Sequence, residues 1–342
     1  MRGGDAESLL VVGPGVLGMR AARVWRKGAG EGATACAKTR TKETAERVAT
    51  EVMATGDEAG EQARSVFDHA MSEWPSGTGQ TYRHVIFSAP PSGNTDYAAE
   101  VATAAARTDW SDDSARFVFT SSAGVYACDE GECAESGAVQ DAASSPRMAR
   151  LLDAERAALS AGGCVVRLAG LYHRTRGAHS YYLKLARDGM SAEASGHTLL
   201  NLIHYDDAAA LVVAALRKGR RGEVYVGADM SPVRRDDMMR ATMLAEDEPS
   251  GDGVGPGELF TGAHEGVPPG KSLNNEWTKS VLQWAPVHAS FESFQRTLVI
   301  ERGGRPTSIS SQSLAVVNAQ GAKGGETQWF IVYMLIGRQK HA

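Results

Sequence analysis

Three glycines near the start of the chain, Gly13, Gly15 and Gly18, are spaced as Gly-x-Gly-x-x-Gly between an apolar run and a segment of helical pattern. The first permits a tight turn, the second lets the backbone approach a pyrophosphate, and the third allows close packing of helix on strand. The helix would point its free N–H groups at the phosphates. We predict a dinucleotide site, with Val16 and Leu17 completing the loop; the alternative is a tight turn that binds nothing.

The second predicted strand, 33–37, is followed by Lys38, Thr39 and Arg40 and not by an acidic residue. NAD-specific sites usually carry an Asp or Glu about twenty residues after the glycines, where it accepts hydrogen bonds from the ribose 2′-hydroxyl. Basic and hydroxyl groups suit a 2′-phosphate instead. We therefore predict NADP(H) in preference to NAD(H), with Arg40 as the main phosphate ligand. The alternative is that these side chains are only the first residues of an exposed helix and bind nothing.

Short apolar runs alternate with helical stretches through the first half of the chain. Strands are predicted at 9–12, 33–37, 84–88, 115–120 and 164–168, and helices at 19–26, 41–55, 97–107 and 146–160. This alternation predicts an α/β fold, a Rossmann-type doubly wound parallel sheet covered on both faces. Ligands of such sheets bind at the carboxyl ends of the strands, where Gly13, Pro90 and Ser121 fall.

After Tyr172 the pattern loosens, and the later elements are shorter. A strand at 201–204 leads to Asp206 and Asp207, which we expect to cap a helix at 208–217. We expect a nucleotide-binding domain at 1–175, to which 200–217 returns, a smaller C-terminal substrate-binding part at 176–300, and an appendage of uncertain order at 301–342 with one short strand at 329–336.

The composition is that of an ordinary globular protein: 342 residues, 42% hydrophobic, 23% charged, with a net charge of -5. This charge gives no basis for nucleic acid or a membrane as partner, and no apolar run approaches the roughly eighteen residues that span a bilayer. We expect a soluble, cytoplasmic protein with a small-molecule substrate, and a homodimer as the oligomer to test. If the gene model is truncated at its start, an organelle-targeting segment could have been lost, and the alternative location is then an organelle.

The four cysteines fall into two kinds. Cys36 and Cys164 lie in apolar runs and are expected to be core residues. Cys128 and Cys133 flank Asp-Glu-Gly-Glu in a predicted loop, where a redox pair is one alternative. No pair of His or Cys completes a zinc set with them, so we predict no metal site.

Several segments together resemble the extended short-chain dehydrogenase/reductase superfamily, of the NAD-dependent epimerase/dehydratase type. They are 13–18, 117–126 (with Thr-Ser-Ser-x-x-Val-Tyr the most specific), 166–172, 201–207 and 273–284, and they extend over most of the chain. The resemblance implies a Rossmann domain and a smaller C-terminal part that holds the substrate over the nicotinamide ring. It also implies that Ala89 and Pro90 lie alongside the adenosine and pyrophosphate, and that Leu171 lies beside the nicotinamide.

The same resemblance assigns roles to polar residues. Ser122 falls where the family has its catalytic Ser or Thr, which hydrogen-bonds the reacting oxygen; a strand-end hydroxyl that caps backbone is the alternative. Tyr126 falls at a tyrosine that lines the site or packs beside it. His204 is a candidate proton donor with an ordinary pKa near 6.5, or else a buried, hydrogen-bonded histidine. Tyr181 and Tyr182 are candidates for the substrate pocket by location.

One family feature is missing. Aligning the helix on Pro146 and Glu155 places Arg147 at the tyrosine and Leu151 at the lysine of the family's Tyr-x-x-x-Lys pair. In that pair a cation lowers the tyrosine's pKa from about 10, so that the phenol exchanges a proton near neutral pH. Leucine supplies no charge, and a guanidinium holds its proton to a pH above about 12. The chain therefore resembles an atypical member of the superfamily.

Two functions follow from this pattern. The first is an NADP(H)-dependent oxidoreductase or epimerase-like enzyme of unknown substrate, with a nonstandard acid. The second is a catalytically silent nucleotide-binding protein that acts in redox sensing or assembly.

Overall fold

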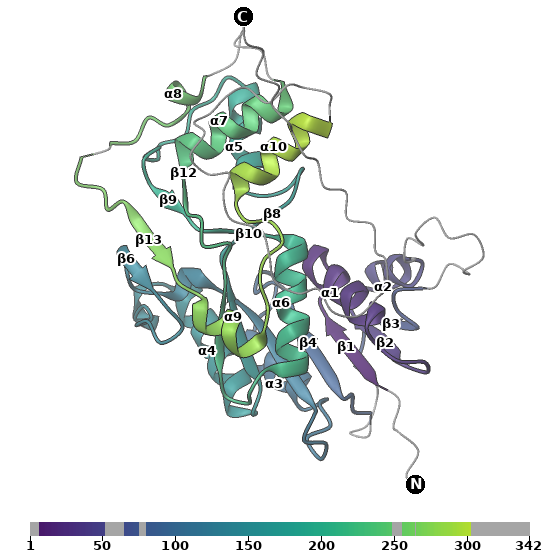
Figure 1. Cartoon of the computed structure of the whole chain (residues 1–342). Helices are drawn as coiled ribbons and strands as arrows, with labels where there is room; N and C mark the ends of the chain where they lie inside the picture. Colours follow the sequence, from purple (N-terminus) through teal and green to yellow (C-terminus); the bar gives the residue numbers. More distant parts are fainter. Residues whose placement is uncertain (1–6, 52–64, 75–79, 248–254, 264, 302–342) are drawn as a thin grey trace, which may run out of the picture. The chain divides into compact units, whose positions relative to one another are not determined.

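The computed structural model describes residues 7–51, 65–74, 80–247, 255–263 and 265–301. Within them, the predicted α/β fold is confirmed: seven strands form one parallel sheet in the order β11-β7-β5-β4-β1-β2-β3 (Figure 1). The strands are β1 (Ser8–Val12), β2 (Thr34–Lys38), β3 (His69–Met71), β4 (His84–Phe87), β5 (Arg116–Ser122), β7 (Cys164–Leu168) and β11 (Val224–Gly227). Because the strands are parallel, crossover connections link them and cover the faces of the sheet.

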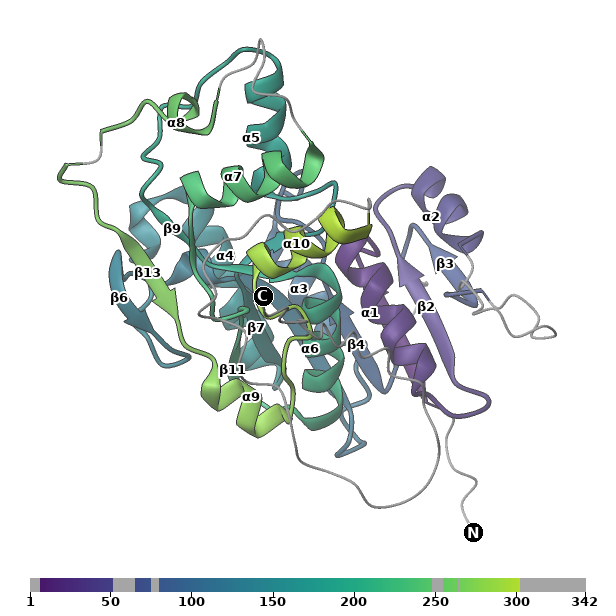
Figure 2. The same ribbon diagram turned by 45° about the horizontal axis from the view of Figure 1, so that its top comes forward.

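Helices pack on both faces of this sheet (Figure 2). They are α1 (Val16–Lys27), α2 (Lys42–Ala49) and α6 (Tyr205–Lys218) on one face, and α3 (Tyr97–Ala105) and α4 (Pro146–Ser160) on the other. Strand β5 shows how one sequence serves two cores. Its Val118 joins the first hydrophobic cluster, while Phe117 and Phe119 join the second, because successive side chains of a strand point to opposite faces.

A third hydrophobic cluster lies outside the sheet and is built from later residues. Its fully buried members include Tyr172, Met238, Met239 and Phe291. The elements outside the sheet are β6 (Glu130–Cys133) with β13 (Gly270–Leu273), β8 (Gly170–Tyr172) with β10 (Leu202–His204), β9 (Leu199–Leu200) with β12 (Val233–Arg234), and helices α5 (Ala178–Arg187), α7 (Arg235–Glu246), α8 (Pro256–Leu259), α9 (Glu276–Leu282) and α10 (Phe291–Glu301). The boundary predicted between 175 and 176 stays a prediction.

Most predicted elements appear within a residue or two of their expected ends, but two expectations need correction. The helix expected at 41–55 ends at Ala49. Helix α6 begins at Tyr205, so Asp206 and Asp207 lie in its first turn, and the capping side chain is His204, which accepts from the Asp206 N–H. The strand expected at 329–336 lies outside the described residues. In the part of the chain that is described, no helix has the length and apolar character to cross a membrane.

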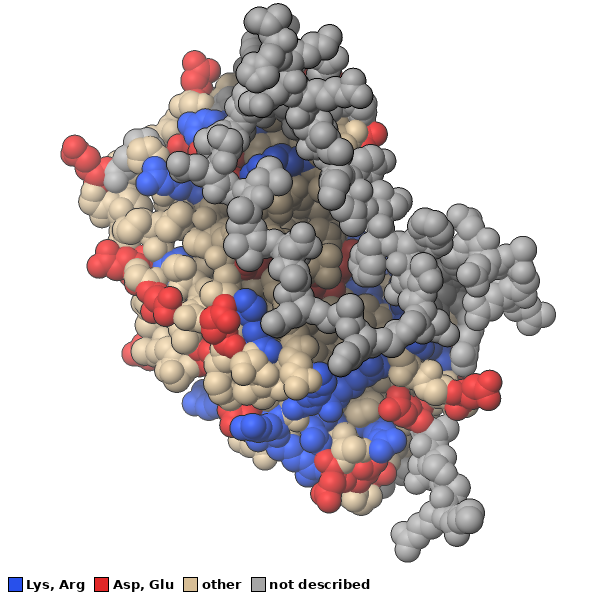
Figure 3. Space-filling view, in the orientation of Figure 1, with Lys and Arg blue, Asp and Glu red and all other residues tan. Residues whose placement is uncertain are grey.

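Both signs of charge occupy the face drawn in Figure 3, with basic side chains gathered toward its lower part. The last turns of the two helices there, α1 and α6, carry Lys27, and Arg217 and Lys218. Cations at helix C-termini offset the negative end of the helix dipole. At these three positions the basic side chains therefore stabilise the helix ends.

Candidate functional site

The glycine loop has the geometry that its spacing predicts. Gly13 has φ +80°, and a Cβ there would lie 2.4 Å from the backbone of Ala89. A Cβ on Gly18 would lie 2.7 Å from the Gly13 carbonyl oxygen and 2.9 Å from Val11 Cγ1, which keeps α1 close to β1. Around Gly15, by contrast, a Cβ would meet no atom within 4 Å. The loop is therefore packed beneath and open above.

Helix α1 begins at this opening with its N–H groups unclaimed by side chains. Its N-cap, Gly15, makes no side-chain hydrogen bond, and its first turn holds no acidic residue. An uncapped helix N-terminus carries partial positive charge and free donors, which together favour an anion such as a phosphate.

A cavity of about 450 Å³ lies over this helix end, at the carboxyl ends of β1, β4, β5 and β7; we call it the glycine-loop cavity. It is lined by Gly15, Val16, Leu17, Gly18, Ser88, Ala89, Pro90, Pro91, Tyr97, Thr120, Ser121, Ser122, Arg147, Leu151, Leu168, Ala169, Leu171, Arg176 and Tyr205. The structure thus gathers nine of the predicted site residues around one space. Gly13 lies below the lining, where its N–H donates to the Lys38 carbonyl.

The three residues predicted to hold a 2′-phosphate do not act together. The Lys38 ammonium is buried, donates to the Thr39 carbonyl at 2.7 Å and lies 5.2 Å from the centre of the Trp74 ring. Burial lowers its pKa. The Thr39 hydroxyl is likewise occupied by backbone carbonyls. Arg40 alone is exposed, with Nη2 donating to the Ser92 carbonyl at 2.7 Å, so the expected support from Lys38 and Thr39 is not seen.

Beneath the cavity, Ser121 belongs to a buried polar network. Its hydroxyl donates to Glu155 Oε1 at 2.5 Å, and Arg167 donates to both oxygens of that carboxylate, at 2.8 Å from Nη2 and 3.1 Å from Nε. The Arg167 guanidinium lies 4.8 Å from the centre of the Tyr126 ring. Such a paired, hydrogen-bonded charge is stable in the interior only while every partner is present.

Tyr126, which was a candidate catalytic residue, has a packing position. Its side chain is fully buried, and its hydroxyl donates to the Glu135 carbonyl at 3.4 Å. Burial raises its pKa, against the opposing effect of Arg167. Since it lines neither cavity described here, the geometry does not support a catalytic role.

Ser122 has a different environment from its neighbour. It is the N-cap of the short 3-10 helix η1 (Ala123–Val125), and its Oγ accepts from the Gly124 N–H at 3.1 Å. It is only half-buried. Its hydroxyl can still donate to an acceptor in the cavity, so the capping and site roles expected from the sequence are compatible.

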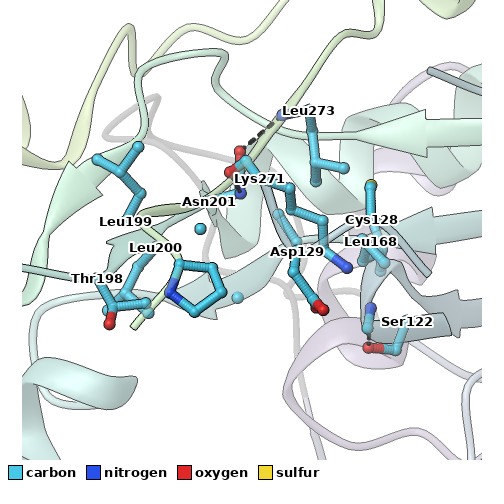
Figure 4. Close-up of a pocket in the computed structure, with 16 residues that line it drawn as sticks. Ser122, Cys128, Asp129, Leu168, Thr198, Leu199, Leu200, Asn201, Lys271 and Leu273 are labelled. Carbon is cyan, nitrogen blue, oxygen red and sulfur yellow. Dashed lines mark hydrogen bonds between the residues drawn. The ribbon is translucent and has the colours of Figure 1, made fainter. Parts of the chain in front are cut away.

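A second cavity, of about 600 Å³, adjoins the first; we call it the neighbouring cavity (Figure 4). The two share Ser122, Leu168 and Ala169 in their linings. Its other lining residues are Ala123, Gly124, Cys128, Asp129, Gly170, Thr198, Leu199, Leu200, Asn201, Pro268, Gly270, Lys271 and Leu273. Apart from Ser122, sequence reasoning missed its polar members as site residues, because they come from short, distant segments without periodic pattern.

The two positions that the sequence alignment places at the family's tyrosine and lysine both face the glycine-loop cavity. Arg147 and Leu151, one turn apart on α4, line it. Arg150, on the same helix, donates instead to the Pro91 carbonyl at 3.5 Å. The candidate pocket residues Tyr181 and Tyr182 line neither cavity: Tyr181 is 61% exposed, and Tyr182 packs against Phe260.

His204 is not placed to donate a proton to either cavity. It is buried, accepts the Asp206 N–H through Nδ1, and stacks on His288 with ring centres 3.8 Å apart. Burial lowers its pKa to about 4, with the charge of His288 acting in the same direction. The imidazole is therefore neutral near pH 7, as expected for the buried, hydrogen-bonded alternative.

Asp207, His204 and His288 offer ligand atoms that all lie within 4.8 Å of one another. The carboxylate, however, already accepts the Val287 N–H at 2.7 Å, the His288 N–H at 3.0 Å and His288 Nδ1 at 2.9 Å. These contacts attach the segment before α10 to α6, and this is the role we assign to Asp207.

Two of the cysteines have the core positions expected for them, and the other two form the pair that the sequence left as an alternative. Cys36 and Cys164 are buried and free. Cys128 and Cys133 form a disulfide, which closes the turn that carries Asp129. Since Cys128 lines the neighbouring cavity, this bond helps to fix one wall of it.

No family model matches the chain, and no curated protein matches it. Solved structures of the same fold do. A functionally unknown conserved protein from Silicibacter pomeroyi is 20% identical, with 86% of this chain and 99% of that one covered and a TM-score of 0.62. UDP-glucuronic acid 4-epimerase from Bacillus cereus, in complex with NAD, is 14% identical, with 85% and 99% covered and a TM-score of 0.64.

A third structure, dTDP-glucose 4,6-dehydratase from Bacillus anthracis in complex with NAD, is 14% identical, with 87% and 97% covered and a TM-score of 0.62. At these identities the likeness is one of fold. The chain therefore has the Rossmann-like α/β fold that these epimerase and dehydratase structures share.

Proposed function

We propose that this chain binds a nicotinamide dinucleotide in the glycine-loop cavity and acts as an oxidoreductase or epimerase-like enzyme of the short-chain dehydrogenase superfamily on a small molecule held in the neighbouring cavity. The observation that carries the proposal is the wall shared by the two cavities, formed by Ser122, Leu168 and Ala169. A cofactor in one and a substrate in the other would meet there.

The residues present fit such a cofactor. The free N–H groups at the start of α1 would hold the pyrophosphate, and the open space above Gly15 would admit it. Ala89 and Pro90 would border the adenosine half, and Leu171 the nicotinamide half. The bound group would supply hydride exchange at a carbon that bears oxygen. Ser122 would hold that oxygen through its hydroxyl.

The preference that we propose is for NADP(H). Arg40 follows β2, is exposed, and is the only member of the predicted trio whose side chain remains available. A guanidinium binds the 2′-phosphate of NADP(H) better than it binds the 2′-hydroxyl of NAD(H), because it is positively charged and offers several donors in one plane.

The test is a titration of the purified chain with NADPH and NADH, followed by cofactor fluorescence. Gly15→Asp places a negative charge in the pyrophosphate path without a steric clash, so NADPH affinity should fall at least about tenfold. Gly30→Asp is the matched control, because Gly30 is also exposed and a Cβ there meets no atom within 4 Å. If neither cofactor binds the unaltered chain, the proposal is wrong.

A silent nucleotide-binding protein is the second candidate. It is favoured by Arg147 and Leu151, which line the cavity where an acid–base pair would be required. Cofactor binding without turnover of any carbonyl compound or nucleotide sugar would support this candidate over the enzyme.

A further inference from the structure

The neighbouring cavity has its charged side chains toward one end, which we call the polar end. Figure 4 shows Ser122, Asp129 and the amino group of Lys271 toward that side, together with Leu168 and Leu273, and shows Leu199 and Leu200 with Thr198 toward the other. The polar end includes the wall that is shared with the glycine-loop cavity.

Lys271 is held in place by three separate contacts. Its strand, β13, pairs with β6, with Lys271 opposite Gly131. The Asn201 amide donates to the Lys271 carbonyl at 2.8 Å and accepts from the Leu273 N–H at 2.8 Å, so it clamps the strand on either side of this residue. The ammonium itself donates to the Tyr126 carbonyl at 2.8 Å.

That last contact relates Lys271 to Ser122. Tyr126 is the C-cap and Ser122 the N-cap of the same short helix η1, so the ammonium is attached to the turn that positions the serine hydroxyl. An ammonium has three donors, and one is used by the Tyr126 carbonyl. The polar end thus has two kinds of side-chain donor, from a lysine and a serine.

The charge of the lining indicates what that acceptor is. Among the described lining residues, Lys271 contributes one positive charge and Asp129 one negative charge. A diphosphate placed here would have Lys271 as its one cationic side-chain partner in the lining, and Asp129 would repel it. A sugar would place hydroxyls against Leu199, Leu200 and Pro268, where Thr198 is the one polar side chain of the lining on that side, and unpaired polar groups are disfavoured in such a site.

Building on the proposed function, we propose that the neighbouring cavity selects an uncharged carbonyl compound with an apolar body, and that Lys271 is a substrate-binding residue. The carbonyl oxygen accepts from Lys271 and Ser122 at the shared wall, and the hydrocarbon body lies along Leu199 and Leu200. Nucleotide sugars are excluded from this cavity by its charge and its apolar wall.

The experiment measures binding of three probes by calorimetry to the full chain, with and without saturating NADP⁺. The probes are hexyl methyl ketone, heptanoate, which has the same hydrocarbon body, and UDP-glucose. We expect the ketone to bind most tightly of the three. Lys271→Met should weaken it about fivefold or more, as expected for the loss of a hydrogen bond from a charged donor. Lys184→Met, at an exposed position on α5, is the control and should leave binding unchanged.

Tighter binding of heptanoate or UDP-glucose, or ketone binding that Lys271→Met does not change, overturns the inference. If Lys271→Met does not fold, Leu200→Asn takes its place, and it should weaken binding of the ketone and not that of UDP-glucose. The NADPH titration on the same protein tests the proposed function separately. Ketone binding without NADPH binding would overturn that function and keep this inference, whereas NADPH binding with a preference for UDP-glucose would do the reverse.

Discussion

At the scale of single residues, the clearest consequences concern buried ionisable groups. Asp229 is buried, and desolvation raises its pKa to about 7, with the charge of Asp207 adding to the effect. The folded state therefore keeps this proton where the unfolded chain, with an Asp pKa near 3.9, has lost it. Stability contributed by this group must fall as pH rises from about 4 to about 7.

We accordingly expect Asp229→Asn to stabilise the protein at pH 8, by about 1–3 kcal/mol, and to have much less effect at pH 4. Urea unfolding at the two pH values measures this difference. An equal change at both would show that the carboxyl is not protonated in the fold. Asp153→Asn, at a half-exposed position on α4, provides the comparison variant.

His204 has the opposite dependence. Its pKa is lowered to about 4 in the fold and is near 6.5 in the unfolded chain, so stability is lost as pH falls from about 6.5 toward 4. His204→Asn keeps an acceptor for the Asp206 N–H but removes the titration. The variant should lose less free energy of unfolding over this interval than the unaltered chain does. His69→Asn, at an exposed position on β3, should leave the slope unchanged.

Arg40 carries the residue-scale prediction about cofactor choice. Removing one charge-assisted contact to a phosphate costs roughly 1.5–3 kcal/mol, so Arg40→Ala should lower NADPH affinity about tenfold or more and leave NADH affinity nearly unchanged. Arg47→Ala, also exposed and on the adjacent helix α2, controls for the loss of a positive charge. Equal losses for both cofactors would remove the case for a 2′-phosphate at Arg40.

At the scale of elements, the sequence predicted the features that depend on neighbouring residues in the chain. Helix α4 and strand β7 have the bounds expected from their apolar pattern, and the glycine loop lies where three spaced glycines require it. The cap of α6 was predicted wrongly, because a histidine acts as the acceptor and the aspartates that follow it have other partners. Local propensity names residues that can cap, but tertiary contacts decide which one does.

The neighbouring cavity could not be predicted for a related reason. Its polar end brings together β5, the disulfide-closed turn at 128–133 and β13, which are far apart in sequence. Asp129 and Lys271 each lie in a short segment whose pattern resembles an ordinary loop. Only the pairing of β6 with β13 places both at one cavity, and no spacing in the chain encodes that pairing.

The disulfide provides a prediction at this scale. Cys128 lines the cavity, and its bond to Cys133 closes the turn that carries Asp129. Opening the bond frees this turn, so the paired change Cys128→Ser with Cys133→Ser should weaken hexyl methyl ketone binding while NADPH affinity stays the same. Calorimetry with both ligands distinguishes this from general destabilisation, which would weaken both.

At the scale of the whole molecule, the two cavities meet at Ser122. A substitution of this residue can therefore change turnover without changing cofactor affinity. Ser122 is half-buried, caps a three-residue helix and lines both spaces. If the chain is an enzyme, Ser122→Ala removes the donor that holds the reacting oxygen and should lower turnover by about a hundredfold. NADPH affinity should stay within about twofold, because the phosphate-binding helix end is untouched.

The matched control is Ser121→Ala, one residue earlier. That hydroxyl donates to Glu155 inside the buried network, so its removal should reduce stability more than turnover. Turnover that is lost with Ser122 but not with Ser121, at constant NADPH affinity, identifies the shared wall as the place of reaction. Equal losses of turnover in both variants would mean that the wall only supports the fold, and absence of turnover in the unaltered chain would favour the silent nucleotide-binding protein.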